Sequence, residues 1–246
     1  MEDKEAYHMD ESLSQFSYLK GNIDNLIMND HTDYPLFSTV KLGSEGVPLF
    51  ASQTTGILSV KPHFGGLQLD FFQNYPDNST KNDVDWSLSG QGNISLDVNN
   101  RYFEPQTVIY ENGAIILEQD AGSIIRGAPP LRIEKHSDGK YSVSLTVIDM
   151  IGDERRVMGA GSVGVSTELW SNTRRTFTDN TEYDIEDFNI TISTKYTKAW
   201  AGWLRNETDL KSEDITVTNN RVVIDLGNNT SDISVTYSKV NVKLSV

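Results

Sequence analysis

The sequence predicts a mainly β protein (α+β), in which an N-terminal amphipathic helix and one short helix pack on antiparallel sheets in a sandwich-like arrangement. Short runs of alternating apolar and polar residues follow residue 34, separated by Gly, Pro, Asn and Asp. A helical spacing of apolar residues occurs at residues 2–29 and again near residues 195–207. No fixed-period repeat and no linker divides the 246 residues, which are enough to bury one large core.

Residues 1–30 are predicted to be the N-terminal helix, a stalk, ahead of a single antiparallel β domain at 31–246. Its apolar residues recur every three or four positions: Met9, Leu13, Phe16, Leu19, Ile23, Leu26 and Ile27. The last turns, around Ile23, should dock on the domain. The opening turns, from Glu2 to Asp10, have few apolar groups to bury, so we expect them to project, fray or pair with a second copy of the chain.

The β domain is predicted to begin with a series of short strands and to continue through hairpins. The expected strands are Leu36–Leu42, Ile57–Val60, Leu67–Phe72, Val84–Leu88 and Ile94–Val98. Hairpins are expected at Asp138-Gly139 and at Asn219-Asn220, and residues 233–246 close the chain as β structure.

The most specific local signal is Asn112-Gly113, which lies between TVIYE and AIILE. This dipeptide favours a two-residue hairpin turn because both positions accept a positive φ. The turn determines the register: Tyr110 should face Ile115, and Thr107 should face Glu118 on the opposite side of the hairpin. Val108 should likewise face Leu117, on the buried side.

A strand that leads directly into a helix is predicted at Phe188–Leu210. Apolar residues first alternate and then recur at Tyr196, Ala199, Trp200, Trp203 and Leu204, the spacing of one helix face. Ser193 or Thr194 is available to cap the helix. Packing in the core is the favoured role of Trp200 and Trp203, although Trp86, Trp170, Trp200 and Trp203 would also suit a sugar platform.

Composition excludes several classes of function. The net charge of −14 argues against nucleic acid and anionic membrane surfaces as partners, because both require a basic face. The absence of cysteine removes disulfides, thiolate nucleophiles and zinc–thiolate sites. The sequence contains no apolar stretch of about 18 residues that would span a membrane.

Two glycine-rich patterns overlap at Gly159–Gly164. The segment fits the dinucleotide-binding motif G-x-G-x-x-G, but the residues after it, VSTELWSNT, are poor helix formers, so we expect a bulged or closely packed strand. Ser162 approximates a nucleophile elbow, yet all four histidines precede it, which excludes the hydrolase order Ser, acid, His. His8, His31, His63 and His136 also lack the spacing of metal ligands.

Acidic residues gather at Asp83/Asp85 and in a second cluster: Asp179, Glu182, Asp184, Glu186 and Asp187. Neither cluster has the glycine and spacing of a calcium loop, and a solvated surface is the expected role. We therefore predict no catalytic residue, cofactor or metal site.

Asn-x-Ser/Thr acceptor sequences are frequent, and together they favour a secreted chain with N-glycosylation. The candidate acceptors are Asn78, Asn93, Asn189, Asn206, Asn228 and Asn229.

These features together resemble archaeal type IV pilin-like secreted and cell-surface proteins. The resemblance rests on the acidic N-terminal helix, the hairpin VIYENGAII, the short segment Ala128–Leu131, the strand GAGSVGV and the strand–helix ITISTKYTKAWAGWL. It implies a soluble ectodomain without its hydrophobic N-terminal helix, which in that family anchors the protein in a membrane or filament.

The expected function is therefore a non-enzymatic, structural or adhesive pilin-like ectodomain at the cell surface. Expected partners are further copies or other cell-surface proteins, reached through the N-terminal helix. A carbohydrate-binding or adhesin β-sandwich without a pilin role is the main alternative, and an unrecognised enzyme is the third.

Overall fold

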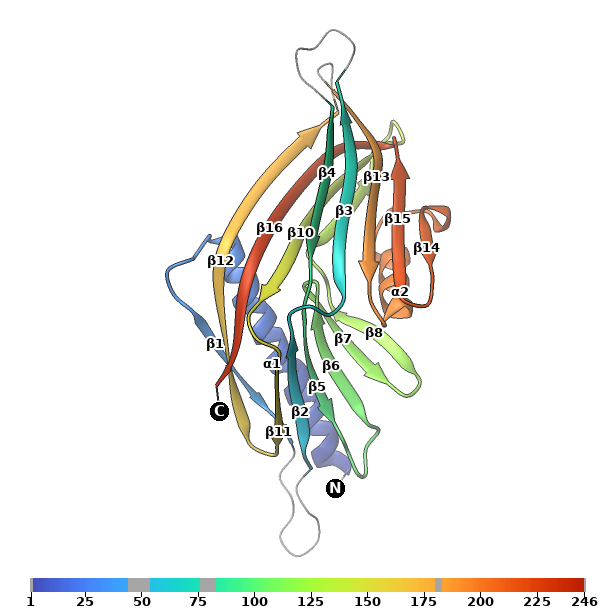
Figure 1. Ribbon diagram of the computed structural model, residues 1–246. Helices are drawn as coiled ribbons and strands as arrows, with labels where there is room; N and C mark the ends of the chain where they lie inside the picture. Colours follow the sequence, from blue (N-terminus) through green and yellow to red (C-terminus); the bar gives the residue numbers. More distant parts are fainter. Residues whose placement is uncertain (1, 44–53, 76–82, 180–182, 246) are drawn as a thin grey trace, which may run out of the picture.

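The protein is an elongated, mainly β molecule, and its described residues include one long helix and one short helix, as the computed structural model shows (Figure 1). The structure describes residues 2–43, 54–75, 83–179 and 183–245. Helix α1 spans Glu2–Met28 and α2 spans Thr197–Glu207. The predicted fold class is confirmed.

The strands of the described residues form three sheets. The first sheet has the order β1-β12-β16-β10-β9, with bounds β1 Leu36–Lys41, β9 Leu131–Lys135, β10 Tyr141–Ile151, β12 Ser162–Thr178 and β16 Thr230–Ser245. The second sheet has the order β11-β2-β5-β6-β7-β8, with bounds β2 Gly56–Lys61, β5 Asn93–Val98, β6 Gln106–Glu111, β7 Ala114–Gln119, β8 Gly122–Gly127 and β11 Arg155–Gly159. The third sheet has the order β14-β15-β13-β3-β4, with bounds β3 Gly66–Asn74, β4 Val84–Gly90, β13 Asp184–Ser193, β14 Ile215–Val217 and β15 Arg221–Gly227.

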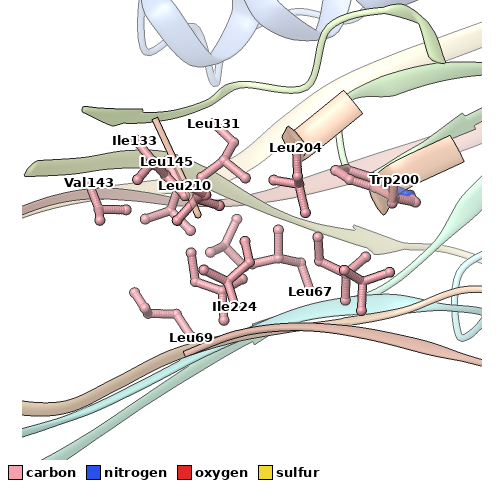
Figure 2. Close-up of a cluster of buried hydrophobic side chains, with 14 of the residues drawn as sticks. Leu67, Leu69, Leu131, Ile133, Val143, Leu145, Trp200, Leu204, Leu210 and Ile224 are labelled. Carbon is pink, nitrogen blue, oxygen red and sulfur yellow. The ribbon is translucent and has the colours of Figure 1, made fainter. Parts of the chain in front are cut away.

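Two hydrophobic cores lie on opposite faces of the second sheet. Val108 and Tyr110 of β6 pack with α1, β1 and part of the first sheet in one core. Ile109, between them in sequence, faces the other core with α2, the third sheet and the remainder of the first sheet. Figure 2 shows Trp200 and Leu204 of α2 beside residues of β3, β9 and β10 in that second core. The central hairpin is therefore apolar on both faces rather than on one.

The hairpin at Asn112-Gly113 has the predicted register. Tyr110 pairs with Ile115, and Thr107 pairs with Glu118. Asn112 and Gly113 have φ values of 49° and 78°, as the turn type requires. The four side chains predicted to share a buried face (Val108, Tyr110, Ile115 and Leu117) are all buried.

The other two predicted hairpins also form, as β9–β10 and β14–β15. The start of α2 is not capped as predicted. The residue before the helix is Tyr196, and no side chain caps the helix start. The Thr194 hydroxyl instead accepts a hydrogen bond from the Tyr196 backbone N–H, at 3.0 Å.

The β domain is not purely antiparallel, which corrects the prediction. β10 and β16 pair in parallel, from Tyr141 with Thr230 to Ile151 with Asn241. A parallel pair needs a long connection, and here strands of all three sheets lie between the two partners. Such distant pairing leaves no turn signature in the sequence, so the local sequence patterns do not predict it.

Strands β12 and β16 are the longest, with 17 and 16 residues, and they pair along their lengths. At one end Val165 and Val242 belong to the α1 core. At the other end Phe177 and Ile233 belong to the α2 core. This strand pair therefore joins the two cores.

Candidate functional site

Helix α1 is docked from its first turns onward, so the prediction that these turns project as a stalk is wrong. Glu5 is 3% exposed, and its carboxylate accepts four hydrogen bonds from the backbone N–H groups of Arg101, Tyr102 and Phe103 at 2.7–3.1 Å. His8 is buried, and its Nε2 lies 3.1 Å from the Lys41 carbonyl oxygen. The contacts of Glu5 and His8 are polar, and the spacing of apolar residues along the helix does not predict them.

The opposite face of α1 is exposed. Five of the twelve large exposed hydrophobic side chains in the described part of the chain lie on α1 or in the segment that follows it; we call this group the α1 belt: Tyr7, Tyr18, Met28, Tyr34 and Phe37. The side chains of Tyr7, Tyr18 and Met28 are each more than 70% exposed. Three of the five lie along the exposed face of α1, which makes this face a candidate interaction surface.

The outer face of α1 has a regular spacing. Residues at alternating steps of four and three lie along it: Tyr7, Glu11, Ser14, Tyr18, Gly21, Asn25 and Met28. The large apolar residues in this row are Tyr7, Tyr18 and Met28, and Glu11, Ser14 and Asn25 between them are polar. At Gly21 no heavy atom lies within 4 Å of the position that a Cβ would occupy. The middle of this face is therefore open.

A buried carboxyl group lies at the end of β6. Glu111 is 0% exposed, and its Oε1 accepts a hydrogen bond from Trp200 Nε1 at 3.2 Å, while Oε2 has no hydrogen-bond partner in the described residues. Burial raises the pKa of Glu111 from 4.5 to about 6, opposed in part by Thr194, Trp200, Lys195 and Asn93. This pair links the hairpin to α2 inside the core.

A polar trough of about 620 Å³ opens over one end of the second sheet. Its lining residues are Thr55, Ile57, Asp97, Val98, Asn99, Pro105, Gln106, Thr107, Glu118, Gln119, Asp120 and Met158. Asp97, Thr107 and Glu118 lie side by side in register on β5, β6 and β7. Thr107 Oγ1 donates to Asp97 Oδ1 at 2.9 Å, and Lys195 Nζ donates to Glu118 Oε2 at 2.9 Å. Glu111 is not part of this lining.

The tryptophans have different environments. Trp200 is completely buried, as predicted, whereas Trp203 is only partly buried against the same core. Trp86 stacks on Phe71 with ring centroids 6.0 Å apart, and Trp170 is 65% exposed at a bulge in β12. The four do not form a row on one sheet face.

The glycine-rich segment at Gly159–Gly164 leads into strand β12, which begins at Ser162. No helix N-terminus is therefore present there to meet a phosphate group. His8, His31 and His136 have separate partners. His8 forms a hydrogen bond with β1, His31 lies against the ring of Tyr34, and His136 forms a hydrogen bond with Ser142.

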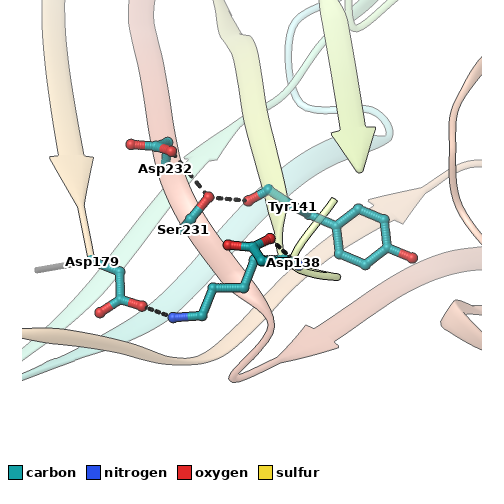
Figure 3. A network of polar contacts seen from close by, with 6 residues as sticks. Asp138, Tyr141, Asp179, Ser231 and Asp232 are labelled. Atoms are coloured by element: carbon teal, nitrogen blue, oxygen red, sulfur yellow. Dashed lines mark hydrogen bonds and ion pairs between the residues drawn. The ribbon is translucent and has the colours of Figure 1, made fainter. Parts of the chain in front are cut away.

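Ion pairing and hydrogen bonds hold part of the second acidic cluster. Lys140 pairs with Asp179, and its backbone N–H donates to Asp138 (Figure 3). Nearby, the Ser231 Oγ lies 3.0 Å from an Asp232 carboxylate oxygen and 3.3 Å from the carbonyl oxygen of Tyr141, two acceptors for its one hydrogen (Figure 3). Glu182 lies outside the described residues. Within the described ranges, no group of three or more His, Asp or Glu side chains is placed to hold a metal ion.

The predicted glycan acceptors differ in accessibility. Asn206, Asn228 and Asn229 are exposed, and Asn189 is half-buried. Asn93 is only 3% exposed, so the folded chain does not present it to an enzyme. Asn78 lies outside the described residues.

Residues 98–243, more than half of the chain, match a family of unknown function, DUF7289. The chain belongs to this family. Comparison with curated proteins and with solved structures gave no match. The matched region begins at the end of β5 and includes the central hairpin, α2 and the long strands β12 and β16, whereas α1 precedes it.

No helix in the described part of this DUF7289 chain is long and apolar enough to cross a membrane.

Proposed function

We propose that this protein is a non-enzymatic, pilin-like ectodomain at the cell surface, with a structural or adhesive role. The α1 belt carries the proposal. Three of its side chains, Tyr7, Tyr18 and Met28, lie on a helix of 27 residues, about 40 Å long, whose other face is fixed to the β domain by apolar and polar contacts. A rigid helix with exposed aromatic side chains along one face suits side-by-side contact with another copy or with another surface protein.

Self-association is tested by sedimentation velocity over a range of protein concentrations. The chain should associate, and Tyr7→Gln/Tyr18→Gln should shift it to the monomer while its thermal stability is retained. Ile124→Thr/Val217→Thr removes two exposed apolar side chains elsewhere and should behave as wild type. A wild-type chain that remains monomeric at every concentration would contradict association through the belt.

Anchoring at the cell surface has a separate test. The proposal expects about 20 apolar residues encoded directly upstream of Glu2, and the full-length product in the membrane fraction. A full-length gene without such a segment, with its product in the cytosol, would refute the pilin-like part of the proposal.

The alternatives expected from the sequence have less support. A sugar-binding surface usually offers aromatic rings, and the trough lining contains none. An enzyme site would bring a carboxyl group with a raised pKa into a cavity, but Glu111 is enclosed in the core against Trp200.

A further inference from the structure

We propose that a pocket between the edges of the first and third sheets binds a small aromatic carboxylate, presented either by a free acid or by a C-terminal aromatic residue. This inference goes beyond the proposed function and does not depend on the α1 belt.

The pocket lies where two sheets end side by side. β4 is an edge strand of the third sheet. β12 pairs with β1 only as far as Thr167, so in the described part of the chain its later residues have no partner strand on that side. The pocket has a volume of about 200 Å³, and its lining residues come from β4, β12 and β16: Trp86, Leu88, Thr173, Arg175, Val235 and Tyr237.

The inner wall of the pocket is apolar. Val235 is 2% exposed and belongs to the α2 core. Trp86, Leu88 and Tyr237 pack against the same core but are only partly buried, so the pocket opens directly onto the core. A cavity of about 150 Å³ with apolar walls holds benzene in preference to water. The pocket therefore has room for one aromatic ring.

Arg175 supplies a positive charge at the entrance. Its Cζ lies 4.7 Å from the centroid of the Trp86 ring, and the side chain is exposed. Its guanidinium makes no ion pair and no hydrogen bond with any group in the described ranges, although the chain has 35 acidic residues. A guanidinium that lies over an aromatic ring still offers the N–H groups at its edge, which bind a carboxylate in pairs.

The two ends of the pocket differ in charge, which orients the ligand. Arg175 pairs with Val235, and Thr173 pairs with Tyr237 two residues further along β16. The Tyr237 hydroxyl donates a hydrogen bond to Asp149 at 3.1 Å, so a negative charge lies at that end. The ligand carboxylate therefore belongs at Arg175 and the ring toward Tyr237. The net charge of −14 opposes an anion at long range, but physiological salt screens charges beyond about 8 Å.

The test is a nuclear magnetic resonance titration of the isotope-labelled full chain at physiological ionic strength. The probes are phenylacetate, the peptide acetyl-Gly-Phe, neutral phenylacetamide and acetate. We expect phenylacetate or the peptide to shift the indole N–H signal of Trp86, which Trp86→Phe identifies, and phenylacetamide and acetate to shift it much less. The tighter of the two aromatic carboxylates distinguishes a free acid from a peptide C-terminus. No shift with either of them at millimolar concentration, or an equal shift with phenylacetamide, would overturn the proposal.

Two neighbouring arginines separate a specific site from general attraction. Arg175→Gln should weaken binding of the carboxylate about tenfold, because charge-assisted hydrogen bonds are lost. Arg174→Gln makes the same change in charge one residue away, where the guanidinium donates to the carbonyl oxygens of Ile27 and Met28 at 2.9 Å, and should have little effect on binding. Equal weakening by both variants, in chains that remain folded, would mean that net charge alone attracts the anion. Unchanged binding in Arg175→Gln would also overturn the proposal.

Discussion

Replacement of Glu111 by Gln should remove a pH dependence of stability that originates in one buried carboxyl group. Burial raises the pKa of Glu111 in the folded chain from 4.5 to about 6, so the folded state holds this proton more tightly than the unfolded state. Its stabilising contribution is therefore complete below about pH 4.5 and is lost as the pH rises through about 6. A difference of one in pKa corresponds to about 1.36 kcal/mol, so the folded chain loses about 2 kcal/mol of its free energy of unfolding over this pH range.

The measurement is urea unfolding of wild type and Glu111→Gln at several values between about pH 4 and about pH 7. The substituted carboxamide retains an acceptor for Trp200 Nε1 and cannot ionise. The stability of the variant relative to wild type should rise by about 2 kcal/mol across this range, while the other carboxyl groups cancel in the difference. Glu207→Gln, at an exposed position, is the control and should give a flat difference. A flat difference for Glu111→Gln as well would refute the assignment of a raised pKa to this group.

Three further changes test the packing, each by urea unfolding at neutral pH. Glu5→Ala should destabilise the fold by about 2–3 kcal/mol because three backbone N–H groups lose a charged acceptor, whereas Lys4→Ala, at an exposed position, should have little effect. Similar small losses for both variants would mean that the first turns are not docked. Trp200→Ala should lower the free energy of unfolding by about 3–5 kcal/mol, and Trp203→Ala, at a partly buried side chain, should lower it clearly less. The reverse ranking would contradict the assignment of Trp200 to the core. Gly113→Ala should destabilise by about 1–3 kcal/mol, because φ is 78° and an added Cβ would collide with Pro130; an unchanged midpoint would argue against the tight turn.

The sequence predicted best where local chemistry determines the structure. Asn112-Gly113 specifies a turn, the turn specifies a register, and Thr107 therefore lies opposite Glu118 as expected. Two of the three residues of the polar row in the trough, Thr107 and Glu118, are therefore placed by that turn alone. Asp97 joins the row through the pairing of β5 with β6, and the irregular residues 99–105 between these strands have no comparable turn signature.

Long-range polar contacts could not be predicted in this way. Glu5 appears in the sequence as one more acidic residue on an exposed helix face, but it binds backbone N–H groups nearly one hundred residues away. Glu111 follows an alternating apolar run, and only the approach of α2 on the far side of the sheet encloses it. Both contacts depend on how the sheets and helices are placed, which the spacing of apolar residues does not encode.

The position of β16 has a consequence for the order of folding. It pairs with β12 on one side and β10 on the other, and its residues Val240, Val242 and Leu244 belong to the core that covers α1. During synthesis α1, β10 and β12 leave the ribosome before β16, so both β10 and β12 have an unpaired edge until β16 emerges. Contacts between such distant segments form slowly because the closure of a long loop must come first. Helix α1 and strand β16 therefore complete one core together, although most of the described chain separates them.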